Sequence, residues 1–365
     1  MRKKFFLLAF VLAILTVLPS CGGVVSTTSA SKRTYIAVVS KGFQHQFWQA
    51  VFAGSKAAAA EFDVDITFEG PPSEADIDKQ IEMVNAALSK QPAALCLAAL
   101  DVSSLMGGLE AAKAAGVPVI GFDSGVPDAP EGIIFSTAST NNYAAGEMAA
   151  AKMMEEPSIA KRIAGASPDS PVCIGVLSQD AVSASILDRT NGFVNALKAI
   201  AENAHPGAVA VIGYHAFAQP AAGKAAVEIK VLVPSTSEYT NAQISAQKML
   251  QDTGALIGVF CSNEGAVTGL LAATNEGMDL DREKGVYKDI TVVGFDAGIT
   301  QKNAVKKQYF YGSITQDPYR IGYLAVELAY RVVNGEAVDA VVDTGCKFYN
   351  YDNIDEPDIA QLVYD

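Results

Sequence analysis

The sequence is poor in the residues that metal sites and disulfide scaffolds need. Its 365 residues include only five cysteines and three histidines, and no two cysteines form a C-x-x-C pair. Neither a disulfide scaffold nor a dedicated zinc site is therefore expected. Positive charge is also scarce, because 27 Lys and Arg face 40 Asp and Glu and leave a formal net charge of −13. So acidic a chain has too few cations to neutralise phosphates, which argues against nucleic acid as a partner.

The motifs of phosphate binding and catalysis are absent too. After the first apolar run the chain reads SKGFQHQFW, where a dinucleotide-binding fold would carry G-x-G-x-x-G, and no Walker A loop occurs. No G-x-S-x-G elbow is present either. The segment 279–290 begins like a calcium loop, but its twelfth residue is Ile290 instead of glutamate. We therefore expect a binding protein that is not an enzyme and uses neither a cofactor nor a metal.

What the chain does have is apolar residues, half of the total, arranged in alternating short and long runs. The short runs predict strands at 35–39, 64–68, 94–99, 117–122, 172–177, 227–233, 256–261 and 290–295. The longer runs predict helices at 45–62, 73–89, 103–115, 184–203, 240–251 and 264–276. Nearly all-apolar strands that alternate with helices indicate an α/β fold whose parallel sheets are covered on both faces.

The second half of the chain repeats the first. Residues 36–40 correspond to 174–178, and residues 119–123 correspond to 292–296, in the same order and with the same final residue. The extra length of the second half falls largely in an Ala- and Gly-rich insertion around 204–226. We expect two similar doubly wound lobes that face each other, with a ligand site beyond the carboxyl ends of their strands.

One aspartate ends a strand in each half, Asp123 in the first and Asp296 in the second. The ordinary interpretation is a cap on the following loop or helix. The alternative is that each carboxylate accepts hydrogen bonds from two hydroxyl groups of a polyol. The paired placement favours the second interpretation.

Two adjacent aromatic residues, Phe47 and Trp48, stand at the start of the helix after the first strand. Aromatic side chains usually pack in a core. Neighbours on a helix point about 100° apart, so at most one of the two can sit fully in the core. The alternative is that one of them lines the cleft, where an aromatic face suits the apolar face of a sugar ring.

Three more polar residues are ambiguous when taken singly. Arg189 lies on a predicted helix, where arginine is usually solvated; Asn263 is an ordinary N-cap; and Gln316 ends a strand that runs into a turn. Asp123, Asp296 and Arg189 together carry one net negative charge. That balance suits a phosphate or carboxylate ligand poorly, since such ligands prefer arginine clusters, and it favours a neutral polyol.

The first twenty residues predict a bacterial lipoprotein signal peptide. A basic start at residues 2–4 precedes an apolar run at 5–18, which is too short for a membrane span. The next residues end in Cys21 and resemble a lipobox, so we expect cleavage before Cys21 and its lipidation; an ordinary secretory peptide is the alternative. Residues 21–33 predict a flexible tether. The protein is therefore expected to be extracytoplasmic and lipid-anchored to the cell membrane.

Five segments together resemble the periplasmic sugar-binding proteins of the ribose and galactose type, whose fold is shared with the effector domains of LacI-type repressors. The segments are VPVIGFDS at 117–124, DRTNGF at 188–193, FCSNE at 260–264, VVGFDA at 292–297 and SITQDP at 313–318. The resemblance extends over about 34–350. It implies the type I periplasmic binding protein fold, in which two similar doubly wound parallel-sheet lobes are joined by a three-strand hinge.

The resemblance also implies a site and lobe boundaries. The first lobe would comprise 34–139 plus 317–342, and the second 140–316 plus 343–365. Phe47 or Trp48 would stack on the sugar, Asp123 and Asp296 would hold vicinal hydroxyls, and Arg189, Asn263 and Gln316 would complete the polar contacts. The predicted ligand-binding set is Ser40, Phe47, Trp48, Asp123, Ser124, Arg189, Asn263, Asp296 and Gln316.

The sequence departs from the pattern of ribose binders, most informatively at Ser124. Ser124 follows Asp123 where those proteins carry an arginine, which removes a hydroxyl donor and speaks against ribose itself. Tyr239 lies near, but not at, the position of the second-lobe aromatic. The prediction is a monomeric solute-binding protein that delivers a neutral monosaccharide or cyclitol to an ABC permease. The alternative is a sensor module that presents a signal furanose or a nucleoside to a membrane receptor.

Overall fold

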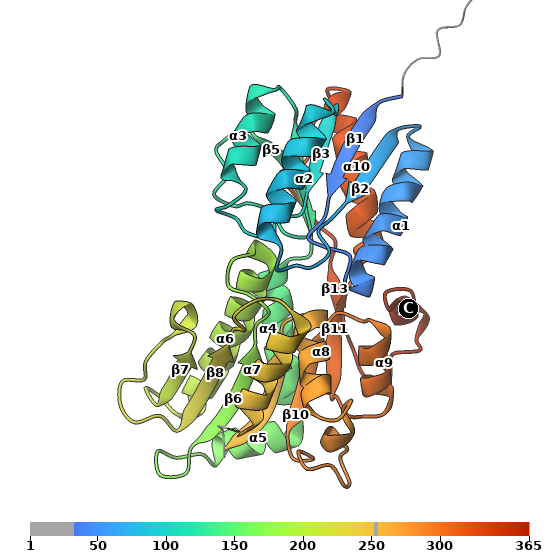
Figure 1. Ribbon diagram of the computed structural model, residues 1–365. Helices are drawn as coiled ribbons and strands as arrows, with labels where there is room; N and C mark the ends of the chain where they lie inside the picture. Colours follow the sequence, from blue (N-terminus) through green and yellow to red (C-terminus); the bar gives the residue numbers. More distant parts are fainter. Residues whose placement is uncertain (1–32, 252–254, 365) are drawn as a thin grey trace, which may run out of the picture. The chain divides into compact units, whose positions relative to one another are not determined.

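A computed structural model describes residues 33–251 and 255–364, and it contains two sheets (Figure 1). The first sheet has six strands in the order β12-β5-β4-β3-β1-β2, all paired in parallel. Their bounds are β1 Tyr35–Val39, β2 Asp65–Glu69, β3 Ala94–Leu97, β4 Val119–Phe122, β5 Ile134–Ser139 and β12 Val341–Asp343. We call this sheet and its helices the first lobe.

The second sheet has seven strands in the order β13-β11-β10-β9-β6-β8-β7, and only the pair of β13 with β11 is antiparallel. Their bounds are β6 Val172–Leu177, β7 Val209–Gly213, β8 Val227–Leu232, β9 Leu256–Cys261, β10 Thr291–Phe295, β11 Gly312–Gln316 and β13 Cys346–Tyr349. We call this sheet and its helices the second lobe. Two doubly wound parallel lobes are what the alternating pattern predicted, so the fold class is confirmed.

Helices cover both faces of each sheet. In the first lobe they are α1 Gln46–Glu61, α2 Ile77–Ser89, α3 Met106–Ala114 and α10 Pro318–Val333. In the second lobe they are α4 Asn142–Glu155, α5 Pro157–Ala164, α6 Ala184–Ala204, α7 Tyr239–Gln251, α8 Glu264–Ala273, α9 Ile299–Lys306 and the single turn α11 Pro357–Ala360, with 3₁₀ turns at His215–Phe217 and Met278–Leu280. Within the described ranges, no helix has the length and hydropathy needed to cross a membrane.

Strands β5 and β7 were not predicted from the sequence. Strand β7 lies inside the 204–226 insertion, at the edge of the second sheet, where β8 is its neighbouring strand. Its five residues are followed closely by a 3₁₀ turn, so the surrounding Ala- and Gly-rich composition hid the short apolar run. Strand β5 alternates buried and more exposed residues instead of being apolar throughout, which made its pattern weak.

The chain passes between the two sheets three times. These crossings join β5 to α4, β11 to α10, and β12 to β13 (Figure 1). Two of them are tied together, because Thr344 N donates to Ser139 O at 3.0 Å and Asn141 N donates to Asp343 Oδ1 at 3.0 Å. The crossings form the three-strand hinge that the sequence analysis expected.

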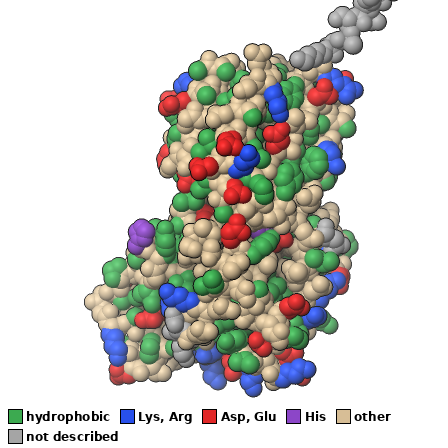
Figure 2. Space-filling model, in the orientation of Figure 1, with side chains coloured by type: hydrophobic (Ala, Val, Ile, Leu, Met, Phe, Trp, Pro, Cys, Tyr) green, Lys and Arg blue, Asp and Glu red, His purple; other side chains and the backbone are tan. Residues whose placement is uncertain are grey.

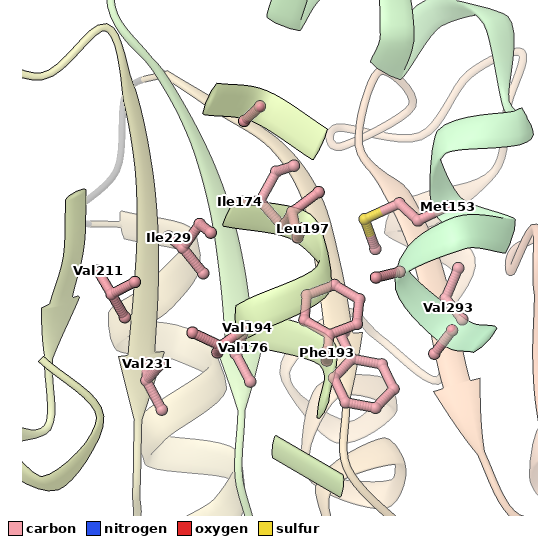
Figure 3. Packing of buried hydrophobic residues seen from close by; sticks show 14 of the residues in the cluster. Met153, Ile174, Val176, Phe193, Val194, Leu197, Val211, Ile229, Val231 and Val293 are labelled. Carbon is pink, nitrogen blue, oxygen red and sulfur yellow. The ribbon is translucent and has the colours of Figure 1, made fainter. Parts of the chain in front are cut away.

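Each lobe has an apolar core on both faces of its sheet. Figure 3 shows part of the second lobe's core, in which Phe193 of α6 and Phe260 of β9 stack with ring centroids 4.3 Å apart. The surface differs from this apolar core: Figure 2 shows acidic side chains over the visible face of the first lobe. The acidic surface agrees with the net charge of −13.

Paired glycines let one pair of helices cross closely in each lobe. A Cβ on Gly146 of α4 would collide with Arg189 O, and one on Gly192 of α6 would collide with Tyr143 O. In the first lobe, α1 and α10 meet in the same way through Gly54 and Gly322. These close helix–helix contacts hold α1 and α6 in place. Helix α1 carries the aromatic side chains, and α6 carries the arginine, into the space between the lobes.

Candidate functional site

Two buried aspartates mark the carboxyl ends of equivalent strands in the two lobes. Asp123 follows β4 and Asp296 follows β10, and their φ angles are +55° and +76°. A left-handed backbone costs a non-glycine residue about 1–3 kcal/mol and occurs mainly where surrounding contacts enforce it. Here Asp123 N donates to Ala138 O at 2.9 Å, and Asp296 N donates to Ile314 O at 2.7 Å. The repeat seen in the sequence is therefore also a repeat of backbone geometry.

Both aspartates line one small cavity between the lobes. Its wall is formed by Lys41, His45, Phe47, Trp48, Glu74, Asp123, Ile186, Arg189, Asn263, Asp296 and Gln316. The cavity has a volume of about 20 Å³, enough for about one water molecule. Seven of the nine residues predicted to bind ligand are thus brought together.

The other two predicted residues, Ser40 and Ser124, are buried but lie behind the wall. Ser40 Oγ donates to Gly42 O at 3.1 Å, and Ser124 Oγ accepts a hydrogen bond from Ser185 N at 3.4 Å. The Ser40 hydroxyl thus donates to a loop carbonyl, and the Ser124 hydroxyl accepts from the start of α6 in the second lobe. Contact of either residue with a ligand stays a prediction.

Phe47 and Trp48 are both buried, at 5% and 1% exposure, and both line the cavity. The expectation that at most one of them could lie in the core was wrong. Their rings are perpendicular, with centroids 5.0 Å apart, and each contacts a different neighbour: Phe122 on the Trp48 side and Tyr364 on the Phe47 side. Because Tyr364 packs on cores of both lobes, it covers the face of α1 that would otherwise reach solvent.

Glu74, which the sequence analysis missed, holds Trp48 from the first lobe and contacts the second lobe as well. Its Oε1 accepts from Trp48 Nε1 at 2.7 Å, and its Oε2 accepts from Gln179 Nε2 at 2.6 Å. Burial alone would raise the pKa of Glu74, but the attraction of His45 and Lys41 with these hydrogen bonds holds that pKa below its ordinary value. Glu74 is therefore an ionised carboxylate that links the lobes directly.

Lys41, also missed, supplies a cation beside Asp123. Its Nζ lies 3.1 Å from Asp123 Oδ2 and donates to Ser185 Oγ of the second lobe at 3.2 Å. Burial lowers the pKa of Lys41, but the combined attraction of Asp123, Glu74 and Asp180 outweighs burial and raises the pKa above its ordinary value. A charged amine therefore stands next to the aspartate that Ser124 directly follows.

Arg189 is 2% exposed and held on all sides, so it is not the solvated helical arginine of the ordinary interpretation. Its Nε and Nη2 donate to Asn142 Oδ1 at 3.2 and 2.7 Å, and its Nη1 donates to Ser262 O at 2.6 Å. The guanidinium lies over the ring of Phe295, 3.4 Å from its centroid. These contacts use three of its five N–H groups and leave two for a ligand.

Asp296 is oriented by two donors of the second lobe. Gln316 Nε2 donates to its Oδ1 at 2.7 Å, and Glu264 N donates to its Oδ2 at 2.9 Å. Each carboxylate oxygen keeps a second lone pair. Gln316 Oε1 is buried and has no hydrogen-bond partner among residues 33–251 and 255–364, so it is a further acceptor.

Asn263 has the N-cap role expected of it, and its contact with a ligand stays a prediction. Its Oδ1 caps α8 by accepting from Ala266 N at 3.0 Å, while its Nδ2 donates to Gln179 Oε1 at the cavity.

Around the rim, further contacts join the lobes. Tyr239 Oη donates to Gln44 O at 3.0 Å, and Ile299 N donates to Gln46 Oε1 at 2.7 Å.

The cavity wall therefore presents acceptors and donors in comparable number. Asp123, Asp296 and Gln316 accept, Lys41 and Arg189 donate, and the two aromatic rings supply an apolar face. The ionisable groups on the wall sum to one negative charge with His45 neutral and to zero with it protonated. In the part of the chain that the structure describes, no cluster of three His, Cys, Asp or Glu could hold a metal ion.

Comparisons with known proteins agree with the two-lobed fold. The family model described as a periplasmic binding protein domain matches residues 36–337. The ribose import binding protein of Bacillus subtilis is 24% identical over 274 residues, which cover 74% of this chain and 73% of that protein.

Two solved structures extend the comparison. A Brachyspira murdochii protein, described as an ABC transporter, LacI family transcriptional regulator, is 35% identical, with a TM-score of 0.75 over 91% of this chain and 99% of that one. An Agrobacterium vitis ABC transporter solute-binding protein with bound D-fucose is 26% identical, with a TM-score of 0.74 over 90% of this chain and 100% of that one.

Proposed function

The chain belongs to the periplasmic binding protein family, and we propose that it captures a neutral monosaccharide or cyclitol between its lobes and delivers it to an ABC permease. Members of this family bind solutes for ABC sugar transporters and are not enzymes. Membership also implies an extracytoplasmic location. The substrate class and the delivery to a permease are the parts that we propose.

The observation that carries the proposal is the chemistry of the cavity wall. Each hydroxyl of a polyol donates one hydrogen and accepts others, so a site for it needs acceptors and donors in similar number. Asp123 and Asp296 supply charged acceptors from opposite lobes, and Lys41 and Arg189 supply the donors. A phosphorylated or carboxylated sugar would meet these two buried aspartates without a cluster of arginines to offset them.

The relatives support a neutral sugar without identifying it. The Agrobacterium vitis protein holds D-fucose, and the Bacillus subtilis protein is named for ribose. For this chain Ser124 argues against ribose, and Lys41 is a donor reaching Asp123 from a different strand end. A donor at a new position favours a sugar whose hydroxyl pattern differs from that of ribose.

Binding would require the lobes to separate and then close. A void of about 20 Å³ cannot admit a sugar while the cross-lobe contacts of Glu74 and Lys41 are made. The three crossings at the hinge are where such a movement would bend the chain. Burying every sugar hydroxyl against a partner on closure is what would give the site its selectivity.

The anchoring and the lobe limits remain part of the proposal. Residues 1–20 would be removed, Cys21 would carry the lipid, and 21–33 would tether the binding lobes; residues 1–32 lie outside the described residues. The first lobe would comprise 34–139 plus 317–342, and the second 140–316 plus 343–365. The protein would act as a monomer that the permease recognises in its closed form.

A panel of sugars in a thermal unfolding assay tests the proposal. We expect one or two neutral sugars, at about 1,000 times their Kd, to stabilise the purified Cys21→Ala protein by about 4 kcal/mol and to raise Tm by several degrees. Sugar phosphates and uronic acids serve as anionic controls of similar size and should have no effect. A shift with an anionic sugar or a nucleoside, and with no neutral sugar, would contradict the proposal.

A further inference from the structure

A second and much larger cavity lies on the other side of Asp123. It has a volume of about 570 Å³ and lies among the loop 125–132, strand β5, the hinge, and the starts of α4 and α6. Its wall includes Val126, Ala129, Thr137, Asn142, Asp188 and Asp343. Pockets that hold small molecules in proteins measure about 300–1,000 Å³, so this one is large enough for a ligand group.

Three side chains separate the two cavities. Asp123 lines both, Lys41 lines only the small one, and Ser185 lines only the large one. Lys41 Nζ contacts both of the others, at 3.1 Å from Asp123 Oδ2 and 3.2 Å from Ser185 Oγ. The partition thus depends on the ion-paired Lys41 side chain, and a ligand that spans both cavities would have to replace its contacts with Asp123 and Ser185.

The large cavity exists while the lobes are in contact. The hydrogen bond from Gln179 to Glu74 and the one from Lys41 to Ser185 are both made in the same structure that contains it. A group in this cavity would therefore not hold the lobes apart. A sugar ring closed in at Asp123 could keep a substituent there.

The chemistry of the wall selects the kind of substituent. Among the residues that the structure describes, no lysine or arginine lines the large cavity, whereas Asp123, Glu131, Asp188 and Asp343 do. Asp188 has no hydrogen-bond or ion-pair partner among the described residues, so its carboxylate is free to accept. Hydroxyl-bearing and apolar residues share the rest of the wall. Such a surface suits a second sugar unit, with its hydroxyls and apolar ring face, and disfavours an anion.

We propose that the preferred ligand is a disaccharide or similar glycoside, with one ring between the lobes and a second neutral sugar unit in the large cavity, linked through the position that faces Asp123. This inference rests on the proposed function, because it needs a sugar bound at Asp123. It adds a second subsite, formed by the 125–132 loop, β5 and α6.

Calorimetric titration tests the second subsite with defined probes: D-galactose against lactose and melibiose, and D-glucose against maltose and cellobiose. We expect one disaccharide to bind at least tenfold more tightly than its monosaccharide. Ala129→Trp, which fills the large cavity, should remove that advantage and leave the Kd of the monosaccharide unchanged. Ala115→Trp, at an exposed position after α3, is the matched control and should change neither value.

A second variant keeps the test independent of any folding defect in Ala129→Trp. Asp188→Ala, at an exposed position on α6, should weaken the disaccharide several-fold and spare the monosaccharide. If monosaccharides bind but no disaccharide binds more tightly, or if both variants weaken the two ligands equally, the subsite is refuted and the sugar-binding function stands. If none of the sugars binds, the proposed function fails together with the inference.

Discussion

Replacing Asp296 with alanine should weaken sugar binding about 100-fold while the protein stays folded. The carboxylate can accept two hydroxyl hydrogens beyond its bonds from Gln316 and Glu264. Hydrogen bonds to a charged group contribute about 1.5–3 kcal/mol each, and losing both would cost about 3 kcal/mol or more, equivalent to about 100-fold in Kd. The Kd from calorimetry, with Tm measured in the absence of sugar, checks the prediction.

Two further variants serve as controls. The first separates the effect of the Asp296 charge from that of its left-handed backbone, and the second removes a carboxylate elsewhere in the lobe. Asp296→Asn retains a side chain that tolerates the φ of +76°, so its Tm should stay near that of the wild type while its affinity still falls. Asp352→Ala removes an exposed carboxylate of the same lobe and should change neither quantity. An unchanged Kd for Asp296→Ala, with the protein folded, would show that Asp296 is not a ligand contact.

Replacing Lys41 with methionine should destabilise the protein by about 3–5 kcal/mol, because it leaves the Asp123 carboxylate buried without its cation. Since the pKa of Lys41 is raised in the folded state, the stability it contributes is fully present below the unfolded value of about 10.4. That contribution disappears as the pH rises through the folded-state pKa. In denaturant unfolding, the stabilities of the two proteins should therefore differ by a constant amount from pH 7 to 9, and the difference should begin to shrink above about pH 10.4.

The double variant Lys41→Met with Asp123→Asn is the control for this prediction. Removing both charges should recover much of the lost stability, because no unpaired carboxylate is left in the interior. Equal stability of Lys41→Met and the wild type at pH 7 would mean that the two side chains are not paired in solution.

The sequence could locate the two aspartates because parallel strands fix where their ends lie. Once residues 119–123 and 292–296 were recognised as equivalent strands, both carboxylates had to face the space beyond the sheets. Arg189, Asn263 and Gln316 followed from the family resemblance, although each was ambiguous alone. The structure brings all five to one cavity.

The residues that the sequence did not reveal act through contacts between distant loops. Glu74 stands in a loop after β2 and is joined to Gln179 of the other lobe, so no local spacing connects the two. Lys41 follows β1, and lysine is mostly exposed in proteins, which gave no reason to place it inside. Their roles depend on how the lobes meet, and hydrophobic periodicity does not encode that.

Ser40 and Ser124 are buried at strand ends but do not line the cavity, so their contact with a ligand stays a prediction. Ser124 follows Asp123 directly, but its hydroxyl is used by Ser185 N, and Ser40 turns to Glu69 O and Gly42 O. Asp123 has a left-handed backbone with a φ of +55°, so the regular alternation of an extended strand ends there and does not predict where the next side chain points.

The most direct test of the central claim is a titration of the protein's tryptophan fluorescence with neutral sugars. Trp48 is the only tryptophan, is 1% exposed, and lines the cavity between the lobes, so its emission reports this site. Our account predicts a saturable change with at least one neutral sugar, which is lost in Asp296→Ala. Unchanged emission with every neutral sugar, or saturation that persists undiminished in Asp296→Ala, would contradict a sugar held between the two aspartates.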